Sequence, residues 1–376
     1  MFDVIVVGAG PAGSIAATVL ARGGARVLMV DRAKFPRHKL CGDTINPGAL
    51  ARLERLGLRA GVDAHAIRID GMVVTGERGV SVHCRYPAGI CGLSIVRRDL
   101  DALLADAAVS AGARFEDGVL VRGPLVDDTA GRQVRGVVIA GRNGRDLRVP
   151  APIVIAADGR RSRIALPLGL ARQPAHPRRW AIGGYFENVT GVGTLGEMHV
   201  RRGRYMGVAP VPSGLVNFCL VVPQQFARGR PERLLDEAAA ADPALRERFA
   251  HARLAGAPTI IGPLAVDASA AGMPGLLLAG DAAGFIDPMT GDGLRFAIRG
   301  GELAAEAALA ALAGDPRPHQ RLARQRRRVF ASKWRFNRVL RQVVDRPGTV
   351  SAATMTARAA PWILQRAIAF AGDVPA

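Results

Sequence analysis

The first residues that could do chemistry are the glycines of Gly8-Ala9-Gly10-Pro11-Ala12-Gly13. They follow the pattern G-x-G-x-x-G. In it the first glycine allows a tight turn, the second lets a pyrophosphate approach the backbone, and the third lets a helix pack closely on a strand. Asp31 lies 23 residues beyond Gly8, where a carboxylate can accept hydrogen bonds from a ribose. This spacing indicates a dinucleotide site.

The elements needed to position these residues surround them. An apolar strand is predicted over residues 2–7, a helix over 14–22 and a second buried strand over 26–30. The helix N-terminus offers free N–H groups to a phosphate. An ordinary turn between strand and helix is the alternative, and the acid at position 31 favours the dinucleotide. Residues 191–196 also fit the glycine pattern, but no helical run follows them, so we interpret them as a turn between antiparallel strands.

A second motif is Gly280-Asp281-Ala282-Ala283-Gly284, followed by residues 288–293, Pro-Met-Thr-Gly-Asp-Gly. The apolar run 275–279 predicts a strand that carries Asp281 to its C-terminal end, where ligands of open α/β sheets bind. A helix is predicted from about Gly291, with its positive end directed at the ligand. Such a dipole would stabilise the negative charge of a reduced flavin.

Bulk composition limits the functional classes. The net charge is +19, yet aromatic residues are only 5% and no stacking platform accompanies the charge, which argues against nucleic acid. The four cysteines lack metal-binding spacing, so no metal site is expected and a reducing compartment is indicated. With neither a signal peptide nor an apolar run of membrane-span length, the sequence predicts a cytoplasmic protein, free or peripheral at a membrane.

These motifs resemble a known class. The segment 8–13, Arg97 ahead of Leu100-Asp101, Asp158-Gly159 with Ser162, and the segment 280–293 resemble the FAD-dependent oxidoreductases of the para-hydroxybenzoate hydroxylase structural class. Phe35-Pro36-Arg37 followed by Leu40-Cys41-Gly42 is similar to the geranylgeranyl reductase and FixC-like branch, which is related to flavin monooxygenases and halogenases. The resemblance covers essentially the whole chain and is more specific for FAD than for the reaction.

The resemblance implies an α/β fold: a Rossmann-type FAD-binding domain interleaved with a strand-rich substrate lobe and followed by C-terminal helices. The expected FAD-binding domain comprises residues 1–66, 94–178 and 259–313, and the substrate lobe comprises 67–93 and 179–258. Residues 314–376 form the helical region. Residues expected to bind FAD are Gly8, Gly10, Pro11, Ala12, Gly13, Asp31, Arg32, Cys41, Gly42, Arg97, Asp158, Gly280, Asp281, Pro288, Gly291, Gly293 and Leu294.

Two residues are candidates for catalysis. Cys41 lies in a matched motif, and the resemblance implies a place for it beside the flavin's reactive face; the alternative role is that of a small buried hydrophobe. Tyr205 begins a segment in which geranylgeranyl reductases usually carry Tyr-x-Trp-x-Phe-Pro, but here Gly207 and Ala209 replace the large aromatics. Tyr205 could equally be a strand residue with its hydroxyl at the rim of the lobe. The pocket is therefore expected to be reshaped.

The expected function is an FAD-dependent oxidoreductase acting on a lipophilic small molecule. The reaction is either C=C reduction or monooxygenation through a flavin hydroperoxide, which gives hydroxylation or epoxidation. The alternative is a FixC-like flavoprotein that carries electrons to quinone. No second nucleotide fingerprint is present, so NAD(P)H or a reduced partner protein would dock transiently as the electron donor.

The segment 317–346 holds eleven basic residues, including Arg326-Arg327-Arg328, interleaved with apolar ones. It predicts a helix with one apolar face. Either this is a solvated basic helix that covers the substrate lobe, or it docks on an anionic surface. That surface would be a membrane leaflet, an acidic carrier protein or an acidic electron donor.

Overall fold

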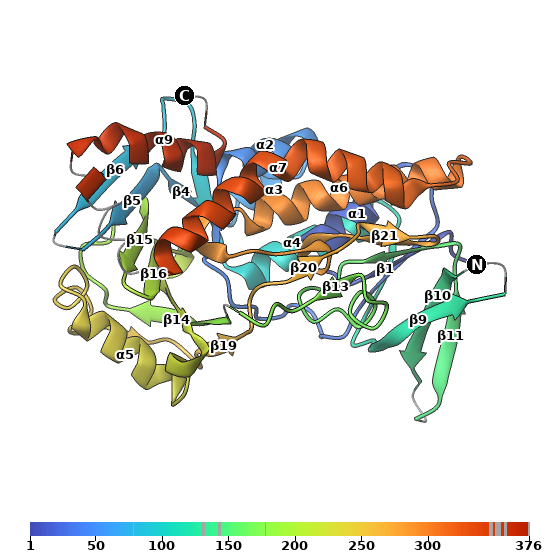
Figure 1. Ribbon diagram of the computed structural model, residues 1–376, viewed down its shortest axis with the longest axis horizontal. Coiled ribbons are helices and arrows are strands. Elements are labelled where there is room, and N and C mark those ends of the chain that lie inside the picture. Colours follow the sequence, from blue (N-terminus) through green and yellow to red (C-terminus); the bar gives the residue numbers. More distant parts are fainter. Residues whose placement is uncertain are drawn as a thin grey trace.

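The computed structural model describes residues 1–374 apart from 78, 130–131, 142–143, 177, 346–348, 350–354 and 357–358. In Figure 1 a sheet near the N-terminus and a second sheet beneath the C-terminal helix α9 lie side by side, with long helices along the top. The fold is α/β, as the sequence predicts.

A six-stranded sheet carries the N-terminal fingerprint. It is parallel except for one antiparallel edge strand, β21. Its order is β21 (Gly272–Met273), β22 (Leu276–Leu278), β12 (Ile153–Ala156), β1 (Val4–Val7), β2 (Val27–Asp31) and β8 (Arg114–Asp117).

The central strand β1 is buried on both sides, which explains its unbroken run of β-branched residues. Val4 and Val6 face a core shared with the helices α1 (Pro11–Arg22), α4 (Arg97–Ser110) and α6 (Gly293–Leu312). Ile5 and Val7 face the opposite core. That side is covered by an antiparallel sheet of β9 (Val121–Asp127), β10 (Gln133–Ala140) and β11 (Asp146–Pro150). Three layers result.

The second large sheet is mostly antiparallel, and among its described strands only β5 and β15 pair in parallel. One face packs on α5 (Pro231–Ala241), and the other faces the interior of the molecule. Its order is β18 (Arg253–Leu254), β14 (Arg179–Glu187), β17 (Val216–Pro223), β16 (Arg204–Pro210), β15 (Leu195–Arg201), β5 (Gly71–Thr75) and β6 (Ser81–Arg85), with β19 (Thr259–Ile261) also paired to β14.

Short elements join these sheets. They comprise β3 (Thr44–Ile45), β4 (Ile67–Ile69) and β7 (Gly92–Ser94) in one small sheet, the pair β13 (Ala171–Arg172) and β20 (Asp267–Ala268), the helices α2 (Pro47–Arg55) and α3 (Arg59–Asp63), and the single turns η1 (Pro212–Gly214), η2 (Gln224–Phe226), η3 (Gly280–Ala283) and η4 (Pro288–Thr290).

The C-terminal part is helical where it is described. Helix α7 (Pro318–Asp345) runs beside α6, and α9 (Pro361–Gly372) lies next to β6 (Figure 1). None of the described helices combines the length and the apolar character that crossing a bilayer requires.

The second glycine pattern, residues 191–196, lies in the connection from β14 to β15 and starts no helix. These two strands do run in opposite directions, but β17 and β16 separate them, so the segment is a crossing loop rather than a hairpin turn.

Candidate functional site

The turn between β1 and α1 forms one wall of a cavity. Gly8 has φ +100°, and a Cβ there would lie 2.4 Å from the carbonyl oxygen of Ala157. A Cβ at Gly13 would lie 1.7 Å from the carbonyl oxygen of Gly8. A Cβ at Gly10 would meet only Arg37 Nη2, at 3.4 Å, because Gly10 faces the cavity. Packing therefore requires Gly8 and Gly13, whereas Gly10 keeps the cavity wall open.

Asp31, at the end of β2, fixes this turn. Its Oδ2 accepts a hydrogen bond from Ala9 N at 2.9 Å, and its Oδ1 accepts one from Ala33 N at 2.9 Å. Arg37 Nε lies 3.8 Å from the same Oδ2. Asp31 thus organises the backbone around Gly8 and Gly10, and its contact with a ribose stays a prediction.

One cavity of about 530 Å³ extends from this turn to the eight-stranded sheet. Every residue assigned to the site from the sequence lines it, except Gly13, which is held behind the turn. These lining residues are Gly8, Gly10, Pro11, Ala12, Asp31, Arg32, Cys41, Gly42, Arg97, Asp158, Tyr205, Gly280, Asp281, Pro288, Gly291, Gly293 and Leu294.

Cationic side chains gather along the cavity near the fingerprint. Arg97 forms a fork with the buried Asp101 carboxylate at 2.9 and 3.0 Å, and Arg37 Nη2 lies 3.1 Å from the same carboxylate. Lys39 and Arg160 also line the cavity, and burial lowers the pKa of Lys39 to about 8. These cations could bind a diphosphate. Of these residues, sequence reasoning assigned only Arg97 to the site, although Arg37 and Lys39 lie in the matched loop.

The second motif adjoins the α1 N-terminus and forms a further part of the cavity wall, since a Cβ at Gly280 would lie 3.0 Å from Ala12 Cβ. Strand β22 leads into η3, where Gly280 has φ +58°, and η4 ends at Gly291 with φ +67°. Both values lie in the left-handed region that favours glycine. Helix α6 begins at Gly293, so its N-terminus points at the cavity, as the sequence predicts.

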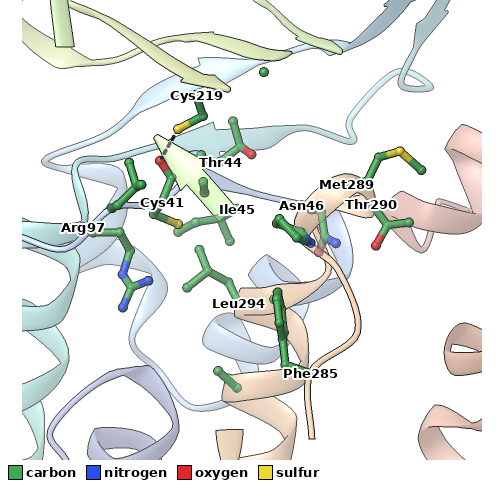
Figure 2. A pocket seen from close by; sticks show the side chains of 18 of the residues that line it. Cys41, Thr44, Ile45, Asn46, Arg97, Cys219, Phe285, Met289, Thr290 and Leu294 are labelled. Atoms are coloured by element: carbon green, nitrogen blue, oxygen red, sulfur yellow. Dashed lines mark hydrogen bonds between the residues drawn. The ribbon is translucent and has the colours of Figure 1, made fainter. Parts of the chain in front are cut away.

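Cys41 lies beside Cys219 of the eight-stranded sheet and near Arg97 of α4 (Figure 2). Its carbonyl oxygen accepts hydrogen bonds from Asn217 Nδ2 at 2.9 Å and from Cys219 Sγ at 3.3 Å, both on β17. The side chain is partly exposed and lines the cavity. Burial raises the pKa of the thiol, against the opposing effect of the Arg97 guanidinium. The thiol is therefore protonated near neutral pH.

Asp43, two residues on, anchors the same loop and was missed by sequence reasoning. It has φ +53° and is fully buried. Its Oδ2 accepts hydrogen bonds from Tyr185 Oη at 2.7 Å and Asn217 Nδ2 at 2.6 Å, and its Oδ1 accepts one from Arg97 N at 3.1 Å. Burial raises the pKa of this carboxyl to about 6, although the hydrogen bonds lower it. Its partners come from distant segments, so no local sequence signal identifies it.

Tyr205 lies in the interior, only 2% exposed, so its hydroxyl is not at the rim. The hydroxyl donates to Asp287 Oδ1 at 2.5 Å. Asp287 also accepts from Met289 N at 3.1 Å, which fixes the start of η4. The Arg179 guanidinium lies 5.7 Å from the Tyr205 ring centroid. Tyr205 therefore links the eight-stranded sheet to the loop before α6, and its part in catalysis stays a prediction.

Comparisons with known proteins agree with this geometry. Residues 1–336 match a protein-family model described as "FAD binding domain". The chain belongs to this FAD-binding family. It is an FAD-dependent oxidoreductase, and it is similar in sequence to reductases and in fold to a further solved structure.

Two relatives and one solved structure illustrate the relationship. The chain is 32% identical over 327 residues to the menaquinone reductase of Mycolicibacterium smegmatis, covering 81% of this chain and 75% of that protein. It is 32% identical over 333 residues to digeranylgeranylglycerophospholipid reductase 1 of Methanopyrus kandleri, covering 84% and 82%. A geranylgeranyl bacteriochlorophyll reductase-like structure from Thermoplasma acidophilum superposes with TM-score 0.82, 23% identity, and coverage of 98% and 95%.

The residues present fit FAD. Gly10 leaves room beside the α1 N-terminus, and cations line the cavity where a pyrophosphate would pass. Asp158 Oδ1 is buried without a hydrogen-bond partner among the described residues. A smaller cavity of about 60 Å³ adjoins Asp31 and is lined by Val119 and Val121. Charged side chains, among them Arg161 and Arg163, line it as well, so its wall is part apolar and part charged.

In this FAD-binding protein the cavity continues past Cys41 into an apolar compartment. The floor is the eight-stranded sheet, where Gly207 adds no side chain and a Cβ would meet nothing nearer than Glu197 O at 4.0 Å. The walls are apolar side chains of three regions: Phe285, Met289, Phe336, Leu340, Leu364 and Ile368. Sequence reasoning did not identify α9 as a wall.

Lys333 holds α9 against α7. Its ammonium is 2% exposed and donates to the carbonyl oxygens of Phe370 and, at 2.8 Å, Ala371 at the end of α9. It also lies 3.0 Å from Asp373 Oδ1 and 3.4 Å from Asp292 Oδ1. A buried cation thus satisfies the last carbonyls of the helix that closes the compartment.

The basic helix differs from the sequence expectation at Arg326. This side chain is only 5% exposed, and its Nη2 donates to Ala283 O at 2.9 Å. The guanidinium lies 5.4 Å from the ring centroid of Phe330 and 5.5 Å from that of Trp334, and burial lowers its pKa to about 10. The three consecutive arginines 326–328 are therefore not all at the surface. Arg326 is buried by its contacts with the aromatic rings and the Ala283 carbonyl, whereas Arg327 is exposed.

Proposed function

We propose that this oxidoreductase saturates a C=C bond of a lipophilic, isoprenoid-like molecule. The supporting observation is the single cavity that joins the FAD groove to an apolar compartment with the protonated thiol of Cys41 between them. Two relatives more than 30% identical are both reductases, which supports a reduction rather than an oxygenation.

Saturation adds a hydride to one alkene carbon and a proton to the other. FAD, when bound and reduced, supplies the hydride. Cys41 Sγ holds the proton, since burial keeps the thiol neutral in the resting enzyme. The Arg97 guanidinium stabilises the thiolate that remains after proton transfer. Asn217 and Cys219 orient the Cys41 backbone through its carbonyl oxygen.

The apolar compartment excludes water from the reacting alkene. The small residues Gly207 and Ala209 widen it beside the cofactor, so a substrate with a ring or branched head can enter. Electrons come from NAD(P)H or from a reduced partner protein, either of which docks transiently. A lipophilic substrate is found in membranes, so we place the enzyme in the cytoplasm with access to a bilayer surface.

We also propose the domain division given by residues 1–66, 94–178 and 259–313, with a substrate lobe of 67–93 and 179–258 and a helical region from 314. The strands of the six-stranded sheet fall within the first set. Strand β19 is an exception: its residues belong to the FAD-binding set, but it pairs with β14 in the eight-stranded sheet.

Product mass tests the reaction. The dithionite-reduced protein is incubated anaerobically with a prenylated quinone and with prenyl alcohols, and the products are then exposed to air. A stable gain of two hydrogens supports alkene saturation. A gain that air reverses indicates electron transfer to the quinone ring, and a gain of one oxygen in aerobic NAD(P)H assays indicates monooxygenation. Either of the last two results, without saturation, overturns the proposal.

A further inference from the structure

Helix α9 has two faces of different environment. Leu364, Ala367, Ile368 and Ala371 line the substrate compartment. The opposite face carries Trp362, Ile363 and Phe370, which are 54%, 43% and 40% exposed. With the exposed Val339 and Met355, they make up half of the large exposed hydrophobic side chains among the described residues, all from one end of the chain. Such a concentration marks a contact surface.

Cations accompany this apolar face. Arg366 lies 5.3 Å from the Trp362 ring centroid and is exposed. On α7, exposed Arg335 and Arg338 flank Phe336, whose ring packs 5.2 Å from that of Phe370. Across the described part of the chain, no acidic side chain forms an ion pair with these three arginines.

We infer that the outer face of α9, together with Arg335 and Arg338 of α7, docks on an anionic lipid bilayer. The apolar side chains enter the interface while the arginines contact lipid phosphates, an arrangement typical of interfacial helices. The inner face of the same helix is a compartment wall, so a lipid substrate can pass from the bilayer to the site beside α9. This route depends on the proposed lipophilic substrate, whereas the docking itself does not.

A bilayer fits this surface better than an acidic protein does. A protein partner would have to cover Trp362, Ile363 and Phe370 with a complementary apolar patch as well as supply acids. A bilayer offers both an apolar interior and surface anions to any helix that lies flat, and it is where an isoprenoid-like substrate resides.

Vesicle sedimentation tests the inference without turnover. The FAD-loaded full chain is mixed with phosphatidylcholine vesicles, or with equimolar phosphatidylcholine and phosphatidylglycerol, at low and high salt. We expect the protein to sediment with the anionic vesicles and salt to release it. Acyl chains brominated near the headgroup should quench Trp362 fluorescence, and Trp362→Phe should abolish the vesicle-dependent quenching.

Two variants and a matched control define the surface. Arg335→Glu with Arg338→Glu should weaken partitioning into anionic vesicles at least about 25-fold, because each cation near the surface contributes about fivefold. Trp362→Gln should weaken it by about tenfold. The control is Phe226→Gln with Arg228→Glu, another exposed aromatic and arginine next to α5, which lies on the other side of the sheet from α9 (Figure 1).

The inference fails if the wild-type protein stays in the supernatant with anionic vesicles, or if the control weakens binding as much as the α9 and α7 variants do. Capture by an acidic protein without vesicle binding would also overturn it. Flavin absorbance and circular dichroism show that each variant is folded. The vesicle assay measures no product, so a negative result there does not bear on alkene saturation. A negative result in the product-mass assay likewise does not bear on vesicle binding.

Discussion

Replacing Asp43 by Asn should remove a pH-dependent part of the protein's stability. The wild-type carboxyl is fully buried, and burial raises its pKa from 3.8 to about 6. The folded protein therefore keeps this proton at pH values where the unfolded chain has already lost it. The stabilising contribution is fully present below about pH 4 and is lost as the pH rises through about 6. A neutral Asn cannot show this change.

The magnitude follows from the shift. A difference of roughly two pKa units corresponds to about 3 kcal/mol, at 1.36 kcal/mol per unit. Urea unfolding at intervals from pH 4 to 7.5, with FAD at a fixed saturating concentration, gives the free energy of unfolding of both proteins. The free energy of the wild type minus that of Asp43→Asn should fall by about 3 kcal/mol over this range. Subtraction cancels other carboxyls, such as Asp287, that burial also shifts.

A second variant tests the assignment. Tyr185 Oη donates to Asp43 and lowers the pKa of the carboxyl. In Tyr185→Phe the pKa of Asp43 should be higher. The free energy of unfolding should therefore begin to fall near pH 4, as in the wild type, but continue to fall to higher pH. A wild-type-minus-Asp43→Asn difference that stays constant with pH would refute the reasoning, because it would show that folding does not raise the pKa of Asp43.

Three further outcomes are expected. Gly10→Val should abolish FAD binding by filling the open wall beside α1, which equilibrium dialysis measures, while intact FAD should be released from the wild type by acid. Cys41→Ser should retain FAD but lower turnover at least tenfold, because a serine hydroxyl is a much weaker acid; unchanged single-turnover rates would return Cys41 to a packing role. Lys333→Met should destabilise the contact between α9 and α7 by about 3 kcal/mol, since it leaves the buried carboxyl of Asp292 without this ammonium and the last α9 carbonyls without their donor, while Asp373 keeps its ion pair with Arg295; hydrogen exchange in α9 should rise in proportion.

Local patterns predicted the cofactor half of the molecule well. The strand, glycine turn, helix and second strand before Asp31 are consecutive in the chain, and each step has a steric reason that a pattern can express. The same holds for Gly280 and the start of α6. Sequence reasoning failed where one side chain depends on several distant segments. Asp43 accepts hydrogen bonds from Tyr185 and Asn217, which lie on two strands of another sheet, and no residue spacing in the sequence predicts these contacts.

The basic helix shows another limit. The pattern of α7 predicted a helix with an apolar face, and the structure has one. It could not reveal that Arg326 is buried, because the partner that draws it inward is a backbone carbonyl of the cofactor loop, at Ala283. Likewise α5 ends at Ala241, and the next residue, Asp242, pairs with Arg201 of the distant strand β15.

The hydrogen bonds that strand β17 makes to the Cys41 carbonyl have a practical consequence. Asn217 and Cys219 line the substrate compartment, yet they hold the loop that lies along the cofactor groove. With the flavin ring beside Cys41, as we propose, a ligand that displaces either side chain would change the surroundings of the ring. The visible spectrum of the holoprotein thus becomes an optical reporter of compartment occupancy. Candidate substrates can be ranked by titration in a cuvette before any electron donor is known.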